Sequence, residues 1–173
     1  ILMHSSLVLT LEGLPLGIAA KKFWSRPKFK NAKALYRKKN ATRIPPEEKE
    51  SYCWIENLSS VNAVLGDPRR LVHVGDRECD IYDFFHAAIA DNSHFLVRIK
   101  INRRTHDETI TIDEAMKNAK SKGNVEISFR GSEGQMHTAR LEVKFETLVI
   151  KPSYGIKTKT FPFSFFSFLA RAN

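Results

Sequence analysis

The feature that most constrains the fold is a short apolar run that ends at a glycine and an aspartate and passes into a helical pattern. Leu71–Gly75 has the length and composition of one buried, central strand. Beyond Asp76, apolar residues recur at the spacing of one helix face, at Ile81, Phe84, Phe85, Ala88 and Ile89. His94–Ile101 then alternates in the manner of a further strand. This strand–helix–strand order predicts a right-handed crossover unit of an α/β sheet.

The residues before this unit predict a hairpin and another helix. His4–Leu11 and Leu14–Trp24 are apolar runs with β character, and a glutamate–glycine pair between them is a turn signal of the hairpin kind. After Pro45-Pro46, a helical pattern follows an acidic first turn and ends near Gly66. Its apolar positions are Trp54, Ile55, Leu58, Val61 and Leu65. We therefore expect residues 1–102 to form a mixed α/β sheet flanked by helices.

The pattern changes after residue 102. A short helical pattern lies around Ile112–Ala119, and three runs of β character follow it, at Val125–Phe129, Ala139–Ile150 and Phe161–Leu169. Residues 103–173 are therefore expected to form a β-rich subdomain. Ile1 opens inside a predicted strand and the last run stops without a cap, so we expect the chain to be a piece of a longer protein.

The basic residues gather in one stretch of the chain. The 28 Lys and Arg residues outnumber 19 Asp and Glu residues, which gives a net charge of +9. Residues 21–43 hold ten of these cations and no acid, so the rest of the chain is close to neutral. A cluster of one sign attracts polyanions through counterion release, and its aromatic residues could pack on bases. From this stretch alone, nucleic-acid binding and a solvated loop are equally good interpretations.

Composition excludes several classes of protein. With 42% hydrophobic residues, the chain has enough apolar matter for a core and is not a low-complexity sequence. No run approaches the roughly 18 apolar residues that span a bilayer, and the first residues lack the pattern of a signal peptide. Cys53 and Cys79 are too few for a disulfide framework, so we expect two free thiols. A soluble, cytoplasmic protein is the expectation.

The candidate chemistry lies where the strand Leu71–Gly75 ends. A carboxylate at the carboxyl end of a strand in an open α/β sheet lies where such sheets bind ligands, and Gly75 would allow a substrate to approach closely. Hard oxygen ligands of this kind suit Mg²⁺ or Mn²⁺. The competing interpretation is structural: Asp76 caps the following helix, while Glu78 and Asp80 complement its dipole.

Five blocks of the sequence, taken in order, resemble one known family. The blocks are His4–Thr10 with Gly13–Gly17, Trp24–Pro27, Glu48–Ser51 with Trp54, His73–Tyr82, and Phe95–Arg98 with Arg103. Together they look like the catalytic core of bacterial cut-and-paste insertion-sequence transposases of the DDE type. The resemblance covers most of residues 1–104. Residues 105–173 resemble the β-rich insertion of such transposases in general character only.

The resemblance implies a ribonuclease-H-like core and a two-metal mechanism. In such a mechanism three carboxylates hold two Mg²⁺ or Mn²⁺ ions, which activate water or a 3′-hydroxyl for attack on a phosphodiester. Asp76 matches the second carboxylate of the family. The first would lie on a strand preceding His4, and the third in a tyrosine–arginine–glutamate helix beyond Asn173, so this chain alone is expected to be inactive. Glu78 and Asp80 match the same block and are expected to support Asp76 and the helix start.

The resemblance also implies a partner. The resemblance implies that such enzymes contact DNA through a basic edge, and the residues that match it are Arg98, Lys100, Arg103 and Arg104. Two weaker candidates for DNA contact, Arg26 and Trp24, come from the first half of the chain. On the residues alone, Arg98 and Lys100 could equally be the solvent face of a half-buried strand. The parent would be a dimer on DNA that cleaves transposon ends and transfers strands. A metal-dependent nuclease with the same core, and a non-catalytic DNA-binding remnant of a decayed element, are the alternatives.

Overall fold

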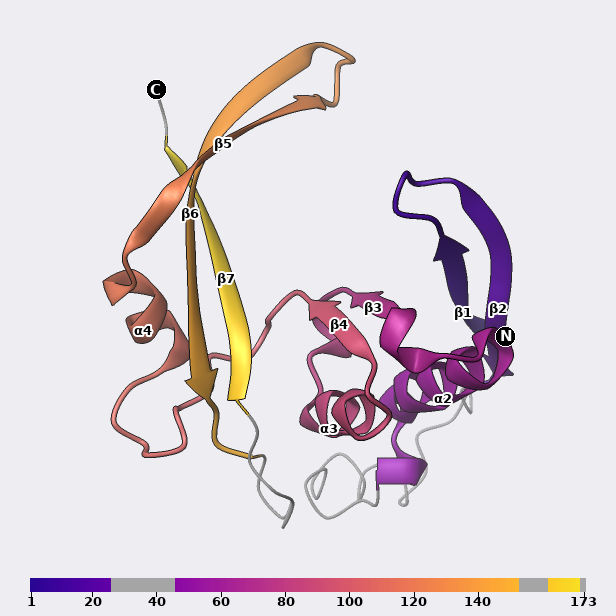
Figure 1. Cartoon of the computed structure of the whole chain (residues 1–173). Helices are drawn as coiled ribbons and strands as arrows, with labels where there is room; N and C mark the ends of the chain where they lie inside the picture. The colour runs from indigo at the N-terminus through magenta and orange to yellow at the C-terminus, as the bar shows by residue number, and fades with distance from the viewer. Residues whose placement is uncertain (26–45, 153–161, 172–173) are drawn as a thin grey trace. The chain divides into compact units, whose positions relative to one another are not determined.

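The computed structural model describes residues 1–25, 46–152 and 162–171 (Figure 1). They belong to two compact units, Ile1–Ile101 and Asn102–Asn173. Helices and small sheets occur together in the chain, which confirms the mixed α/β class. Within the described ranges, no helix is both long enough and apolar enough to cross a membrane.

The first unit opens with the predicted hairpin. Strands β1 (Leu2–Leu9) and β2 (Pro15–Trp24) pair antiparallel, from Leu2 opposite Trp24 to Leu9 opposite Pro15. In the turn, Gly13 has a φ of 85°, a left-handed conformation that glycine adopts without strain. Along β1 the exposure alternates, because one face of the hairpin packs on a helix and the other does not.

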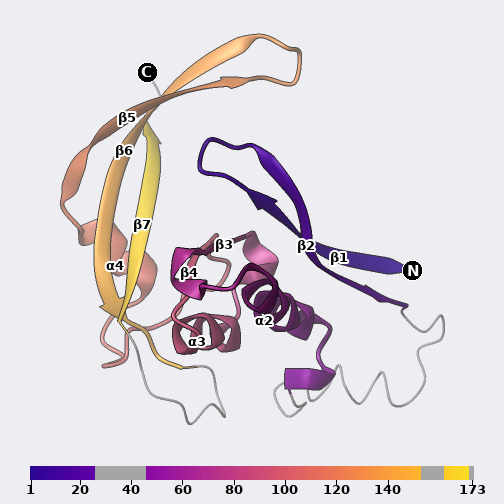
Figure 2. The same ribbon diagram turned by 45° about the vertical axis from the view of Figure 1, so that its right-hand side comes forward.

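That helix is α2 (Cys53–Leu65), which follows short 3₁₀ turns at Pro46–Glu48 and Glu50–Tyr52. It lies along the hairpin (Figure 2), and its buried face consists of Cys53, Asn57, Leu58, Val61 and Asn62. Asn57 Nδ2 donates to Ser6 Oγ on β1 at 3.2 Å, and Lys22 on β2 forms an ion pair with Glu56. The helix ends at Gly66, whose φ is 89°.

The strand–helix–strand unit is also present. Strands β3 (Val72–Gly75) and β4 (His94–Val97) pair in parallel, and α3 (Tyr82–Ala90) connects them. Phe85 of α3 stacks on Phe95 of β4, with ring centroids 5.0 Å apart. The crossover helix therefore covers one face of this pair of strands, as the helical spacing after Asp76 predicts.

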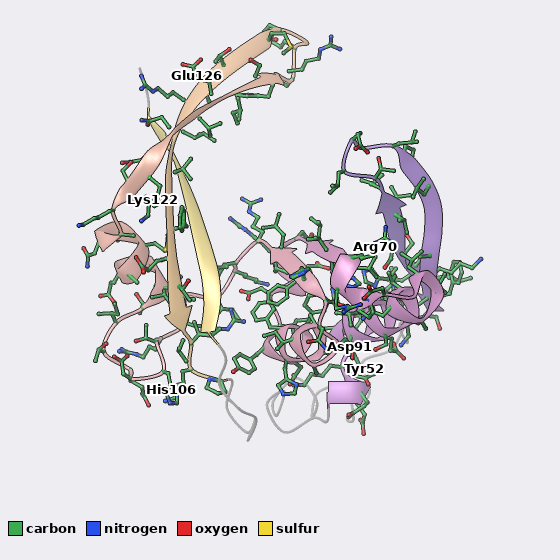
Figure 3. The ribbon with its side chains drawn as sticks, in the orientation of Figure 1. Tyr52, Arg70, Asp91, His106, Lys122 and Glu126 are labelled. Atoms are coloured by element: carbon green, nitrogen blue, oxygen red, sulfur yellow. The ribbon has the colours of Figure 1, made fainter. Side chains whose placement is uncertain are left out.

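A cluster of polar side chains connects α2 and α3 with strand β3. Asn62 Oδ1 lies 3.0 Å from His73 Nε2 on β3 and accepts from the Ser93 hydroxyl at 3.2 Å. Asn62 Nδ2 donates to Asp91 Oδ2 at 2.9 Å, just beyond the end of α3 (Figure 3). Each of these polar side chains thus has a partner where α2, β3 and α3 meet.

Two expectations for the sheet are wrong. β3 is neither buried nor central among the described strands, since Val72 and Val74 are 55% and 72% exposed and β3 pairs only with β4. The strand expected over His94–Ile101 ends at Val97, because the N–H groups of Lys100 and Ile101 bond to a carboxylate instead of a strand. The described strands of this unit consequently form two small sheets, β1–β2 and β3–β4.

The second unit contains one helix and a three-stranded antiparallel sheet. Helix α4 (Ile112–Asn118) starts at a capping box, in which Thr111 Oγ1 accepts from the Glu114 N–H and the Glu114 carboxylate accepts from the Thr111 N–H. The strands are β5 (Ser121–Arg130), β6 (Met136–Val149) and β7 (Pro162–Arg171), in the order β5–β6–β7. Lys122 and Glu126 mark the course of the exposed β5 in Figure 3. The predicted short helix and three β runs are confirmed.

Candidate functional site

Asp76 directly follows β3, at the carboxyl end of the parallel pair. It is the N-cap of a 3₁₀ turn, Arg77–Cys79, and its Oδ1 accepts a hydrogen bond from the Glu78 N–H at 2.9 Å. The capping interpretation is therefore correct for one oxygen, although the capped element is this turn and not α3. Asp76 is exposed, so Oδ2 lies open to a further partner.

Position 75 has room only for a glycine, because a side chain there would overlap a neighbouring residue. A Cβ on Gly75 would lie 2.5 Å from Cys79 Cβ and 2.8 Å from Cys79 Sγ, closer than real atoms approach. The 3₁₀ turn can therefore fold back over the strand end only because residue 75 has no side chain. Cys79 is fully buried, and burial, followed by the charges of Asp76 and Asp80, raises the pKa of its thiol to about 12. Cys79 thus packs as a neutral side chain at neutral pH.

Two aromatic side chains pack together near the strand end. Trp54 Cζ3 of α2 is 3.6 Å from the position of a Gly75 Cβ, so the indole supports the strand end. The His4 ring of β1 meets the Trp54 ring edge to face, with centroids 4.3 Å apart. Burial lowers the pKa of His4, against the opposing effects of a hydrogen bond to the Cys53 backbone and the charges of Glu78 and Asp76. Sequence reasoning did not identify either residue as part of this site, because β1 and α2 lie far from Asp76 in the chain.

The two other acidic residues of the block differ in environment. Glu78 is exposed in the same turn as Asp76. Asp80 is only 5% exposed, and its Oδ2 accepts from the N–H groups of Lys100 and Ile101, each at 2.7 Å. Asp80 therefore anchors the segment that follows β4, a contact that its place in the sequence did not indicate.

The basic candidates differ in their local surroundings. Arg98 is exposed, and its backbone N–H donates to the Gly75 carbonyl at 3.2 Å, which places it beside the Asp76 strand end. Lys100 is exposed next to it in the chain. In the second unit Arg104 is exposed and donates to the Glu108 carbonyl at 3.1 Å. Arg103, in contrast, is only 9% exposed and has a partner within the protein.

The remaining two candidates come from the first half of the chain. Trp24 ends β2, and its Nε1 donates to Glu50 Oε1 at 2.6 Å, so the indole N–H is held by the segment before α2. Arg26, like most of the basic stretch, lies outside the described residues. Of that stretch, Lys21 and Lys22 are described on β2.

A complete metal centre is not formed by the residues that the structure describes. Among them, no three His, Cys, Asp or Glu side chains lie close enough together to hold a metal ion. Asp76 fits such a centre as one ligand, because it is an exposed hard oxygen donor at a strand end.

In comparisons with known proteins, no family model matches the chain and no curated protein matches it.

Proposed function

We propose that this chain is part of the catalytic core of a DDE-type DNA transposase and that Asp76 is one of its metal-binding carboxylates. The observation that carries the proposal is the position of Asp76. It lies exposed at the carboxyl end of a parallel strand, in a β–α–β unit, with a glycine before it and one carboxylate oxygen open. Ligand sites of open α/β sheets lie at this end of their strands.

The order of elements supports the proposed ribonuclease-H-like core. An antiparallel hairpin comes first, then a helix packed on it, and then a parallel strand pair joined by a helix. This is the order that the resemblance to the transposases requires. The β-rich second unit corresponds in this proposal to their insertion subdomain.

The proposed cofactor is Mg²⁺ or Mn²⁺, with two ions in the complete protein. When bound, the ions supply a nucleophilic oxygen and stabilise the leaving oxygen of a phosphodiester. This chain contributes the Asp76 carboxylate, which accepts a hydrogen bond from the Glu78 N–H. The turn that contains Glu78 packs closely on Gly75 through Cys79. The other ligands belong to parts of the protein outside the described residues, so cleavage and strand transfer are proposed for the whole protein.

The charge distribution supports DNA as the partner. The chain has a net charge of +9, and the exposed Arg98 lies beside the Asp76 strand end. Cations near a metal-binding carboxylate are suited to hold the phosphates of a substrate. A dimer assembled on DNA in the bacterial cytoplasm is part of the same proposal.

A cleavage assay with the chain joined to its flanking coding sequence tests the proposal. The wild type is expected to cut transposon-end DNA with Mg²⁺ and to join the ends to a target, whereas Asp76→Asn is expected to bind DNA without cutting it. Asp113→Asn is the matched control, because it removes one exposed carboxylate from the first turn of α4 in the other unit. Cutting by the Asp76→Asn protein at the wild-type rate would refute the role of Asp76, and cutting without joining would indicate a nuclease.

A further inference from the structure

Strand β5 forms one edge of the three-stranded sheet, because the strand order is β5–β6–β7 (Figure 1). Every residue of β5 is exposed, and β6 is its one partner among the described strands. An uncovered edge presents a row of backbone N–H and C=O groups that can pair with another strand. The only irregularity of β5 is a register shift near its start, between Ser121 and Gly123. Residues 124–130 therefore form a regular, open edge.

The hairpin turn fixes which backbone groups of β5 face this edge. The Gly131 N–H donates to the Gln135 carbonyl at 2.8 Å, so residue 131 bonds towards β6. In an antiparallel pair, residues that bond to the partner strand alternate with residues that do not. The register of β5 with β6 is unbroken from Gly123 to Arg130, so the odd-numbered residues bond to β6. The residues whose backbone groups point to the free edge are Glu126, Ser128 and Arg130.

The side chains of β5 differ between its two faces. The polar face carries the same three residues, with a negative charge at Glu126 and a positive charge at Arg130, placed symmetrically about Ser128 (Figure 3). The other face is apolar, and its side chains are 41–48% exposed; they belong to Val125, Ile127 and Phe129. A strand with this pattern is complementary to an antiparallel copy of itself.

We propose that β5 pairs antiparallel with β5 of a second copy of this chain, with Ser128 opposite the partner's Ser128 on a two-fold axis. In this register Glu126 lies opposite the partner's Arg130, and the symmetry repeats the pair on the other side of the axis. Ile127 lies opposite the partner's Phe129. Opposite charges and aromatic–β-branched pairs that face each other directly stabilise antiparallel strands.

The charges select this register over its neighbours. Because only the even-numbered residues bond outward, the partner strand can shift only in steps of two residues. One step places Glu126 opposite the partner's Ser128 and removes both ion pairs. A second step places Glu126 opposite the partner's Glu126, and facing like charges are destabilising. Lys122, the other cation of β5, lies beside the register shift, where regular pairing ends.

Sedimentation of the full 173-residue chain, without DNA or metal, tests the pairing. The wild type is expected to show a monomer–dimer equilibrium that depends on concentration. Glu126→Arg replaces both attractive pairs by repulsive ones, so it should raise the dissociation constant of the dimer about tenfold. The double variant Glu126→Arg with Arg130→Glu exchanges the two charges and should restore the wild-type value. Circular dichroism melts check that each variant is folded.

A cysteine at the two-fold axis tests the register without changing a charge. Residues opposite each other in a hydrogen-bonded pair have Cα atoms about 5.5 Å apart, within reach of a disulfide. Under oxidised glutathione, Ser128→Cys should therefore form a covalent dimer. Thr138→Cys is the matched control, because Thr138 is exposed opposite Ser128 on β6 and their hydroxyls share one hydrogen bond of 3.3 Å. In the proposed dimer it lies three strand spacings from its copy, roughly 14 Å, and should not cross-link. Cys53 and Cys79 are buried and present in both variants.

The outcomes decide both the partner and the register. A wild type that stays monomeric at every concentration overturns the proposal. A dimer that Glu126→Arg leaves unchanged overturns it as well, because the copies then associate through another surface. Equal cross-linking by Ser128→Cys and Thr138→Cys, or a double variant as weak as Glu126→Arg, overturns the register. The pairing involves neither Asp76 nor DNA, so it goes beyond the proposed function and each can fail without the other.

Discussion

The substitution Gly75→Ala tests the packing that holds Asp76 in place. The added Cβ would lie 2.5 Å from Cys79 Cβ and 2.8 Å from Cys79 Sγ, and Cys79 is fully buried in the turn that carries the cap. Cys79 Cβ is bonded directly to the backbone and cannot rotate away, so the turn itself must move. Forcing an extra methyl group into a packed interior costs about 1–3 kcal/mol, which increases the unfolded fraction roughly 5- to 150-fold.

Urea unfolding followed by tryptophan fluorescence measures this cost in the first unit, because Trp24 and Trp54 are the two tryptophans of the chain. Gly131→Ala is the matched control. Its Cβ would lie 2.7 Å from His137 Nε2, a comparable overlap, but the imidazole belongs to an exposed side chain that can rotate away. The control, followed by circular dichroism, should change stability by no more than about 0.5 kcal/mol.

Removal of the obstructing side chain gives a second check on the same reasoning. Cys79→Gly eliminates both of the atoms that a Gly75 Cβ would meet, so Gly75→Ala should cost less in that background than in the wild type. If Gly75→Ala unfolds at the wild-type urea concentration, the turn is not packed on the strand end and the description of the Asp76 site is wrong.

Three further predictions concern DNA, stability and pH. The chain should bind duplex DNA with little sequence preference and with an affinity that falls steeply as the salt concentration rises, since residues 21–43 hold ten cations. If a fluorescence titration finds an affinity independent of salt, this stretch is excluded as the DNA-contacting surface. Thr111→Ala removes the capping box with Glu114 and should destabilise the second unit by about 1 kcal/mol in circular dichroism melts, whereas an unchanged melt would contradict the cap. Burial lowers the pKa of His73 below its ordinary 6.5, against the charge of Asp91, so the unfolded chain takes up the proton first. The stability that this histidine contributes is present above about pH 6.5 and lost as the pH falls; a His73→Gln variant with the same pH slope as the wild type would contradict this.

The helices and strands could be predicted from the sequence, but the solvent exposure of their side chains could not. Periodicity is a local property, so the hairpin, α2, the β3–α3–β4 unit and the strands of the second unit could be predicted from it. A five-residue apolar run cannot show how many faces of a strand are covered. Val72 and Val74 are therefore apolar and exposed, contrary to expectation.

The same limit applies to the candidate site. Asp76 could be identified because strand end, glycine and carboxylate are neighbours in the chain. Asp80 looked equivalent to Glu78 in sequence, and only the fold brings the N–H groups after β4 to it. His4 carried no signal at all, since its contact with Trp54 depends on the packing of β1 against α2.

The measurement that tests the central claim most directly is Mn²⁺ binding by the wild type and by Asp76→Asn, each joined to its flanking coding sequence, with the free ion measured by electron paramagnetic resonance. Asn caps a turn nearly as well as Asp, so the variant should melt within a few tenths of a kcal/mol of the wild type. If Asp76 is a metal ligand, the variant should bind Mn²⁺ roughly tenfold or more weakly, because a divalent ion and a carboxylate about 4 Å apart attract by about 2 kcal/mol even in water. Equal affinity in the two proteins would show that Asp76 only caps the turn and would contradict its proposed role.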